Sequence, residues 1–123
     1  MALVLHESAE MYLETIHVLH LKNGHVRAVD IAQRMGYSKP TISEWMGKLR
    51  DAGYVTVENS GNIVLTEQGQ EIAGHIYERH LLLTNFFEKI GVDPDIAEDD
   101  ACRVEHYISD KTFDALKKHL EEM

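Results

Sequence analysis

The sequence predicts a mainly α-helical fold that contains one small β-hairpin. Apolar residues recur at helical spacing along most of the 123-residue chain. The exception is the stretch YVTVENSGNIVLT, in which two short β-rich runs flank the turn-forming residues 59–62, Asn-Ser-Gly-Asn. The length suits a single compact unit or two small lobes that share a core.

The helices before the hairpin are marked by start and stop signals. Ser8 is the predicted N-cap of the first helix, in SAEMYLETIHVLHL. The next helix, Val29–Met35, is short and ends at the tight turn of Gly36. A third helix, Ser38–Ala52, begins with a serine cap and has Pro40 in its first turn. Two helices joined in this way form a helix-turn-helix, and the hairpin that follows makes it a winged helix.

Three further helices are predicted after the hairpin. The first is long and is capped by Thr66, the second begins at Asp93, and Asp110 is the predicted cap of the last. We expect two domains. Residues 1–74 would form the winged helix-turn-helix domain, and residues 75–123 a helical domain.

The charge of the chain is distributed unevenly. The formal net charge is −9, yet residues 21–50 carry six basic and two acidic residues. A basic stretch in a helix-turn-helix favours binding to the phosphates of double-stranded DNA, while the acidic remainder favours a cationic partner. The alternative is a winged helix that binds another protein and has ordinary surface charges.

The helix Ser38–Ala52 is expected to enter the major groove of DNA, where its N-terminal residues would meet base edges. The predicted base-contacting residues are Thr41, Ser43 and Glu44. Glu44 would be repelled by phosphates, but it could accept a hydrogen bond from a cytosine amine. The other residues expected at the DNA interface, mainly against the backbone, are Arg27, Ser38, Lys39, Pro40, Lys48 and Arg50.

The stretch DDACRVEHYISD contains the only cysteine of the chain. On a helix, Cys102, Glu105 and His106 would share one face, because they are spaced i, i+3 and i+4. Three donors hold a divalent ion weakly, and a lone cysteine is more often a small buried apolar residue. Further donors are available elsewhere in the chain, at Met11, Glu14 and His80.

Five segments, in the same order, resemble the diphtheria toxin repressor family, which includes iron-dependent regulators and manganese transport regulators. They are SAEMYLETI, YSKPTIS, VLTEQGQEIA, ERHLLLTNFF and DDACRVEHYISD. The resemblance implies a cytoplasmic homodimer that binds a pseudo-palindromic operator when loaded with Fe(II) or Mn(II) and so represses metal-uptake genes. It also implies that the helical second domain serves dimerisation and metal binding. Many iron-branch members add a C-terminal SH3-like domain, and we expect the two-domain form without it.

The same resemblance implies two metal sites. The primary site would be formed by Met11, Cys102, Glu105 and His106. These are the residue types of the iron branch, whereas the manganese branch has aspartate and glutamate at the first two positions. The second site would be formed by Glu14, His80 and Glu98, or would stay empty. It is less complete, because the carboxylate that the family places four residues after the histidine is Thr84 here.

The expected metal follows from the softness of the donors. A thioether and a thiol in place of two carboxylates favour Fe(II) over Mn(II), and they also admit Co(II), Ni(II) or Zn(II). One alternative is a manganese-responsive regulator of the same family. Another is a metal-independent winged-helix regulator in which Cys102 senses a ligand or an oxidant. We do not expect an enzyme, since the sequence has no nucleophile motif or phosphate-binding loop. The lone cysteine and the absence of a long apolar run predict a cytoplasmic protein without a membrane span.

Overall fold

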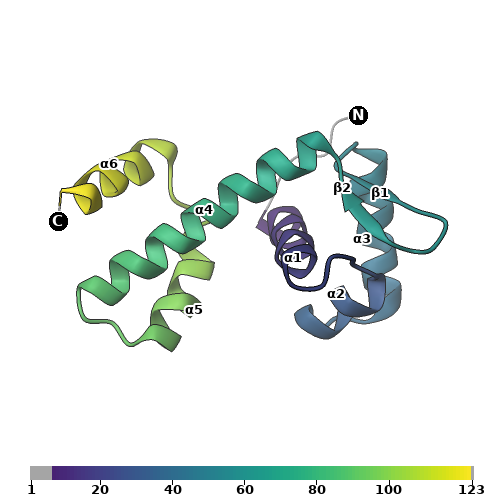
Figure 1. The fold of residues 1–123 in the computed structure, drawn as a ribbon, viewed down its shortest axis with the longest axis horizontal. Coiled ribbons are helices and arrows are strands. Elements are labelled where there is room, and N and C mark those ends of the chain that lie inside the picture. Colours follow the sequence, from purple (N-terminus) through teal and green to yellow (C-terminus); the bar gives the residue numbers. More distant parts are fainter. Residues whose placement is uncertain (1–6, 123) are drawn as a thin grey trace. The chain divides into compact units, whose positions relative to one another are not determined.

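The computed structural model describes residues 7–122, and its order of elements is drawn in Figure 1. The elements are α1 (Glu7–Asn23), α2 (Ala28–Met35), α3 (Lys39–Asp51), β1 (Val55–Val57), β2 (Ile63–Leu65), α4 (Glu67–Lys89), α5 (Pro94–Val104) and α6 (Asp110–Glu121). The chain forms two compact units, Met1–Gly74 and His75–Met123, and α4 contributes to both. The predicted fold class, mainly α-helical with one hairpin, is confirmed.

The first unit is built around buried side chains of α1. Tyr12 and Ile16 are each 1% exposed, and they belong to one hydrophobic cluster with Ile31 of α2 and Ile42 of α3. Full burial of such a side chain stabilises a fold by about 1.5–3 kcal/mol. Between α2 and α3 the chain reverses at Gly36, whose φ of 74° is readily adopted only by glycine.

The start of α3 follows the prediction from the sequence. Ser38 is the N-cap, and its side chain accepts a hydrogen bond from the backbone N–H of Thr41 at 3.4 Å. Pro40 lies in the first turn, where its missing N–H costs no helical hydrogen bond. Together with the glycine turn, this confirms the helix-turn-helix.

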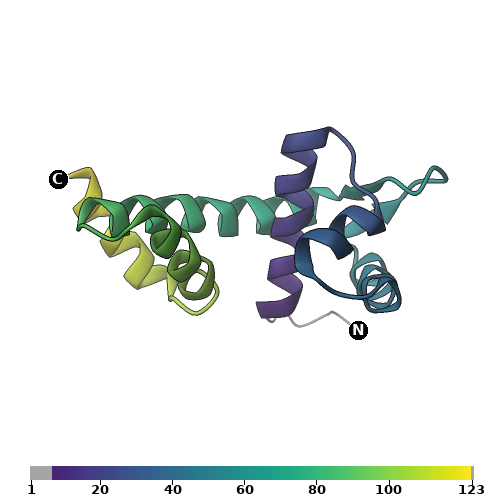
Figure 2. The same ribbon diagram turned by 90° about the horizontal axis from the view of Figure 1, so that it is seen from below.

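The hairpin forms the predicted wing (Figure 2). Its strands pair antiparallel, with Val57 opposite Ile63, and Gly61 adopts a φ of 89° in the turn. Asn62 ties this turn to the segment before α2, because its Oδ1 accepts a hydrogen bond from the backbone N–H of Val26 at 2.9 Å. The backbone N–H of Ile63 donates to the Val26 carbonyl at 2.7 Å. The wing is therefore held against the helices of its own unit.

The start of α4 is fixed to the wing. Thr66 Oγ1 accepts a hydrogen bond from the Gly69 N–H at 3.1 Å and donates one to the Gly53 carbonyl at 2.7 Å. The predicted threonine cap is therefore confirmed. Gly69 lies so close to the wing that a Cβ added there would be 2.1 Å from the carbonyl oxygen of Tyr54.

The second unit packs α5 and α6 with the C-terminal part of α4 (Figure 1). Its buried apolar residues are Ile76, Leu83, Ala97, Ala101 and Phe113. Among the described residues, no helix is long and apolar enough to cross a membrane.

Two predicted helix caps are wrong. Ser8 lies inside α1 and does not cap it. The cap of α6 is Ser109, whose Oγ accepts a hydrogen bond from the Thr112 N–H at 3.2 Å. Asp110 is instead the first helical residue, and its carboxylate accepts a hydrogen bond from Arg79. The tertiary contact therefore decides between two good capping residues that are adjacent in the sequence.

Candidate DNA-binding face and metal centre

The predicted DNA-contacting residues lie on and around α3 in the first unit. The exposed ones are Arg27, Ser38, Lys39, Pro40, Ser43, Glu44, Lys48 and Arg50. Thr41 differs from these, since it is half-buried and its hydroxyl lies 2.9 Å from the Ser38 hydroxyl. The Thr41 hydroxyl is thus part of the helix cap, and its methyl group remains the part able to contact a base.

Several charged side chains on α3 have partners on the same helix. Lys48 Nζ lies 3.5 Å from a carboxylate oxygen of Glu44 and 4.8 Å from the ring centroid of Trp45. Arg50 lies 3.5 Å from Asp51. Exposed ion pairs of this kind are worth less than about 1 kcal/mol. Both cations can therefore exchange these partners for a DNA phosphate at low cost.

Met11 and Glu14 lie one helical turn apart on α1. Met11 lines a pocket of about 130 Å³ within the first unit, together with Thr41 and Trp45 of α3. In the same pocket the ring of Tyr12 stacks on Trp45, with 4.9 Å between centroids. Burial raises the pKa of the Tyr12 phenol. A predicted metal ligand and a predicted base-contacting residue therefore line one cavity.

His80, Cys102 and Glu105 gather within the second unit. Each residue offers one ligand atom: an imidazole nitrogen, the thiol sulfur and a carboxylate oxygen. These three atoms lie within 4.8 Å of one another. His80 Nδ1 is 2.9 Å from Glu105 Oε2, and His80 Nε2 is 4.0 Å from Glu98 Oε1. Residues that were predicted for the primary and the second metal site therefore lie together, from α4 and α5.

The motif around Cys102 is not helical throughout. α5 ends at Val104, so Glu105 is its C-cap and His106 lies in the turn that follows. His106 Nε2 is 3.3 Å from Glu105 Oε1, within ion-pair distance when the imidazole is protonated. Of the three residues predicted to share a helical face, only Cys102 lies on the helix. Glu105 and His106 lie at its end and in the turn that follows.

The donor set in the second unit fits a divalent transition metal. An imidazole, a thiol and carboxylates are ligands of Fe(II), Mn(II), Co(II) and Zn(II), and the harder carboxylates suit Mn(II). Oε1 of Glu105 is buried and has no hydrogen bond within residues 7–122, and a cation would satisfy it. Thr84 has a neutral side chain and so adds no carboxylate, and its hydroxyl donates to the His80 carbonyl at 2.7 Å.

Sequence reasoning missed Arg79. This arginine is buried, and Nη1 donates hydrogen bonds to the carbonyls of Glu105 at 3.1 Å and Ile108 at 2.7 Å. The segment 105–108 that carries two predicted ligands is thereby bound to α4. In the sequence, the one signal is the position of this arginine directly before His80.

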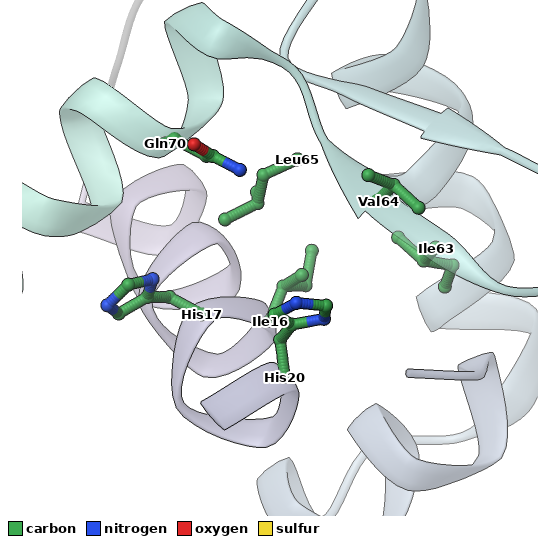
Figure 3. A pocket seen from close by; sticks show the side chains of 7 residues that line it. All are labelled: Ile16, His17, His20, Ile63, Val64, Leu65 and Gln70. Atoms are coloured by element: carbon green, nitrogen blue, oxygen red, sulfur yellow. The ribbon is translucent and has the colours of Figure 1, made fainter. Parts of the chain in front are cut away.

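A separate pocket of about 230 Å³ lies in the first unit between α1, β2 and the start of α4 (Figure 3). His17, His20 and Gln70 line it together with apolar side chains. The pKa of His17 is lowered by burial and, to a smaller extent, by the charge of His20. The predicted DNA-contacting and metal-binding residues lie outside its lining.

Comparison with known proteins identifies both parts of the chain. Residues 4–63 match the family model for the N-terminal DNA binding domain of the iron dependent repressor. Residues 66–123 match the family model for the metal binding and dimerisation domain of the iron dependent repressor. The transcriptional regulator MntR of Salmonella typhimurium is 36% identical over 109 residues, which are 89% of this chain and 69% of MntR. An uncharacterized HTH-type transcriptional regulator of Methanocaldococcus jannaschii is 32% identical over 117 residues, which are 94% of each chain.

Solved structures share the fold. The manganese regulator SloR has a TM-score of 0.80 and 28% identity, over 97% of this chain and 55% of SloR. A manganese-dependent transcriptional repressor solved in complex with manganese has a TM-score of 0.84 and 30% identity, over 92% of this chain and 52% of its own. This chain therefore spans about half the length of these two proteins.

The two family matches are consecutive, and they fall on the winged helix and on the helices that follow it. The relatives are transcriptional regulators rather than enzymes. The resemblance drawn from the sequence motifs is confirmed. The chain belongs to the diphtheria toxin repressor family of metal-dependent transcriptional regulators.

Proposed function

We propose that this chain represses transcription by binding a pseudo-palindromic operator as a homodimer when it is loaded with a divalent metal, and that it controls metal-uptake genes. The main support for the proposal is that this one chain contains two features. One is a winged helix with exposed basic residues, and the other is a cluster of an imidazole, a thiol and a carboxylate. Both family matches support this pairing.

DNA recognition is assigned to α3. In a homodimer the two copies of α3 must lie about 34 Å apart to enter successive major grooves. Lys48 and Arg50 would neutralise phosphates, and Ser43 and Glu44 would reach base edges. The methyl group of Thr41 would contact a thymine methyl.

The proposed primary ligands are Met11, Cys102, Glu105 and His106, and the proposed second set is Glu14, His80 and Glu98. The clustering of His80, Cys102 and Glu105 supports metal binding by the second unit. When bound, the ion would supply a positive charge that compensates the carboxylates. His80 Nδ1 lies at hydrogen-bond distance from the Glu105 carboxylate, so this pair would orient both side chains before the ion arrives.

Manganese(II) is the metal that the relatives support. SloR is a manganese regulator, and the other solved relative is a manganese-dependent repressor. The cluster also offers the carboxylate of Glu105, and the Glu98 carboxylate lies 4.0 Å from His80 Nε2; both are hard donors that suit Mn(II). This support favours the manganese alternative over the iron preference that we derived from the sequence.

Iron(II) remains a second candidate because of one observation, the thiol of Cys102 in the cluster. A thiolate is a softer donor than a carboxylate and favours Fe(II) over Mn(II). Thiolate ligation releases a proton, so metal affinity should fall as the pH is lowered.

Metal binding would reach α3 through α1. Met11 shares a pocket with Thr41 and Trp45, so a change in the position of the Met11 side chain alters the packing of α3. To convert a mostly inactive population into a mostly active one, the metal must bind the active form more strongly by about 5 kcal/mol.

The test compares Cys102→Ala and His106→Ala with the matched control His119→Ala, which removes an exposed histidine of α6. Fluorescence anisotropy measures operator binding with and without added metal, and circular dichroism checks the fold. We expect the first two variants to fold and to lose metal-stimulated binding, while His119→Ala keeps it. Metal stimulation retained in both Cys102→Ala and His106→Ala would contradict the ligand assignment. Full operator binding by the wild type in chelator would instead favour the metal-independent regulator.

A further inference from the structure

Arg79 is a buried cation that binds the segment after α5. Only 7% of the residue is exposed. Its guanidinium donates to the carbonyls of Glu105 at 3.1 Å and Ile108 at 2.7 Å, and to the carboxylate of Asp110. It also lies 5.4 Å from the ring centroid of Phe113. One side chain of α4 therefore holds the turn that connects α5 to α6.

One of these contacts satisfies a group that the end of a helix leaves without a partner. The last carbonyls of a helix have no helical N–H to bind, and the helix dipole places partial negative charge there. Glu105 is the C-cap of α5, so its carbonyl is such a group. The planar guanidinium can donate to several acceptors at fixed angles, which a lysine ammonium cannot do in the same way.

Arg79 and His80 are adjacent, and together they hold Glu105 at both ends. Arg79 binds the main-chain carbonyl of Glu105, while His80 Nδ1 lies 2.9 Å from its side-chain carboxylate. The thiol of Cys102 belongs to the same cluster, one turn earlier on α5. A displacement of the backbone at Glu105 would therefore change the distances from its carboxylate to the donors of His80 and Cys102.

We propose that Arg79 is a positioning residue for metal capture, which fixes the backbone of the turn 105–108 so that the donors of His80, Cys102 and Glu105 stay within ligand distance of one another. This inference rests on the proposed metal-dependent function. Arg79 itself would not contact the ion. Its effect on DNA binding would arise through metal affinity alone.

The test uses the full-length protein and anaerobic titration with Co(II), whose absorption reports a bond to a thiolate. Arg79→Met keeps an unbranched apolar stem and removes the guanidinium with its donors. Arg79→Lys keeps the charge but not the planar fork. The matched control is Arg103→Met, since Arg103 is an exposed arginine next to Cys102, and its loss changes the net charge equally. Thermal unfolding of the metal-free forms is measured in parallel.

We expect Arg79→Met to weaken Co(II) binding at least tenfold and to reduce the thiolate band even at saturating Co(II). Arg79→Lys should weaken binding about threefold to tenfold, and Arg103→Met less than twofold. A residue with a merely structural role would lower the melting temperature but leave the spectrum at saturation unchanged. If Arg79→Met does not fold, the Co(II) affinity and the thiolate band of Arg79→Lys test the positioning role instead.

Two results would overturn the inference, and they have different meanings. If the wild type shows the Co(II)–thiolate band and the folded Arg79 variants match it in affinity and spectrum, the positioning role is wrong and the proposed function stands. If the wild type itself shows no Co(II) binding that depends on Cys102, the metal assignment fails and the role of Arg79 fails with it.

Discussion

The close approach of α4 to the wing gives a sharp prediction for Gly69→Ala. The added Cβ would lie 2.1 Å from the carbonyl oxygen of Tyr54, 3.1 Å from its carbonyl carbon and 3.3 Å from Leu65 Cδ2. The oxygen cannot move aside freely, because it accepts a hydrogen bond from the Thr66 N–H at 3.0 Å. The start of α4 or the hairpin must therefore shift, and the threonine cap shifts with it.

Two effects of opposite sign decide the magnitude. Alanine is favoured over glycine inside a helix by about 1 kcal/mol. Overpacking of a tightly packed site costs about 1–3 kcal/mol, and a contact with backbone belongs at the upper end. The net expectation is a loss of about 1–2 kcal/mol in the free energy of unfolding. In urea denaturation this would lower the midpoint by about 1 M, for a slope near the lower end of the range for small proteins.

Gly74→Ala is the matched control in the same helix. A Cβ at Gly74 would meet nothing within 4 Å, so this change should stabilise the protein by up to about 1 kcal/mol. The two substitutions should thus shift the urea midpoint in opposite directions. An equal or higher stability of Gly69→Ala compared with Gly74→Ala would refute the close packing of α4 on the wing.

Three further predictions concern the DNA-binding face and the second unit. Arg50→Ala should weaken binding to all DNA sequences alike and reduce the slope of log K against log salt by about 1; an unchanged slope would exclude a phosphate contact. Thr41→Val should keep the base preference measured by DNA selection, because the methyl group remains; a changed preference at one base pair would mean that the hydroxyl reads DNA. The hydrogen bond from Lys117 lowers the pKa of Glu78 below its usual 4.5, although burial of the carboxylate acts in the opposite direction. The ion pair therefore stabilises the fold above about pH 4.5, and this stabilisation is lost as the pH falls and Glu78 becomes protonated. Urea unfolding should thus give Glu78→Gln a lower free energy of unfolding than the wild type at neutral pH and an equal one in acid. A difference in the free energy of unfolding that stays constant at all pH values would contradict this.

Local sequence signals were sufficient for the helix-turn-helix of the first unit, although the predicted Ser8 cap of α1 is wrong. Ser38, Pro40 and Gly36 act within one turn of their own position, so the helix-turn-helix could be predicted from spacing and residue type. The cap of α6 could not be predicted in the same way. Ser109 and Asp110 are both good caps, and the hydrogen bond from Arg79, 31 residues away in sequence, decides between them.

The candidate metal cluster was only partly visible in the sequence. The spacing of Cys102, Glu105 and His106 was interpreted as one helical face, but α5 ends at Val104. The contact between His80 and Glu105 joins positions 25 residues apart, and no local periodicity contains it. The family resemblance predicted His80 as a donor, but only the structure shows that it lies next to Cys102 and Glu105. The relatives, not the donor softness, moved the expected metal from iron towards manganese.

Control of DNA binding by metal can be tested in a single selection experiment. Random-sequence DNA is captured under anaerobic conditions by the purified protein with Mn(II), with Fe(II), and with a chelator. If metal controls DNA binding, a palindrome is enriched with metal and not with chelator, and Mn(II) acts at a lower free concentration than Fe(II). Enrichment of the same palindrome to the same extent in chelator would contradict it.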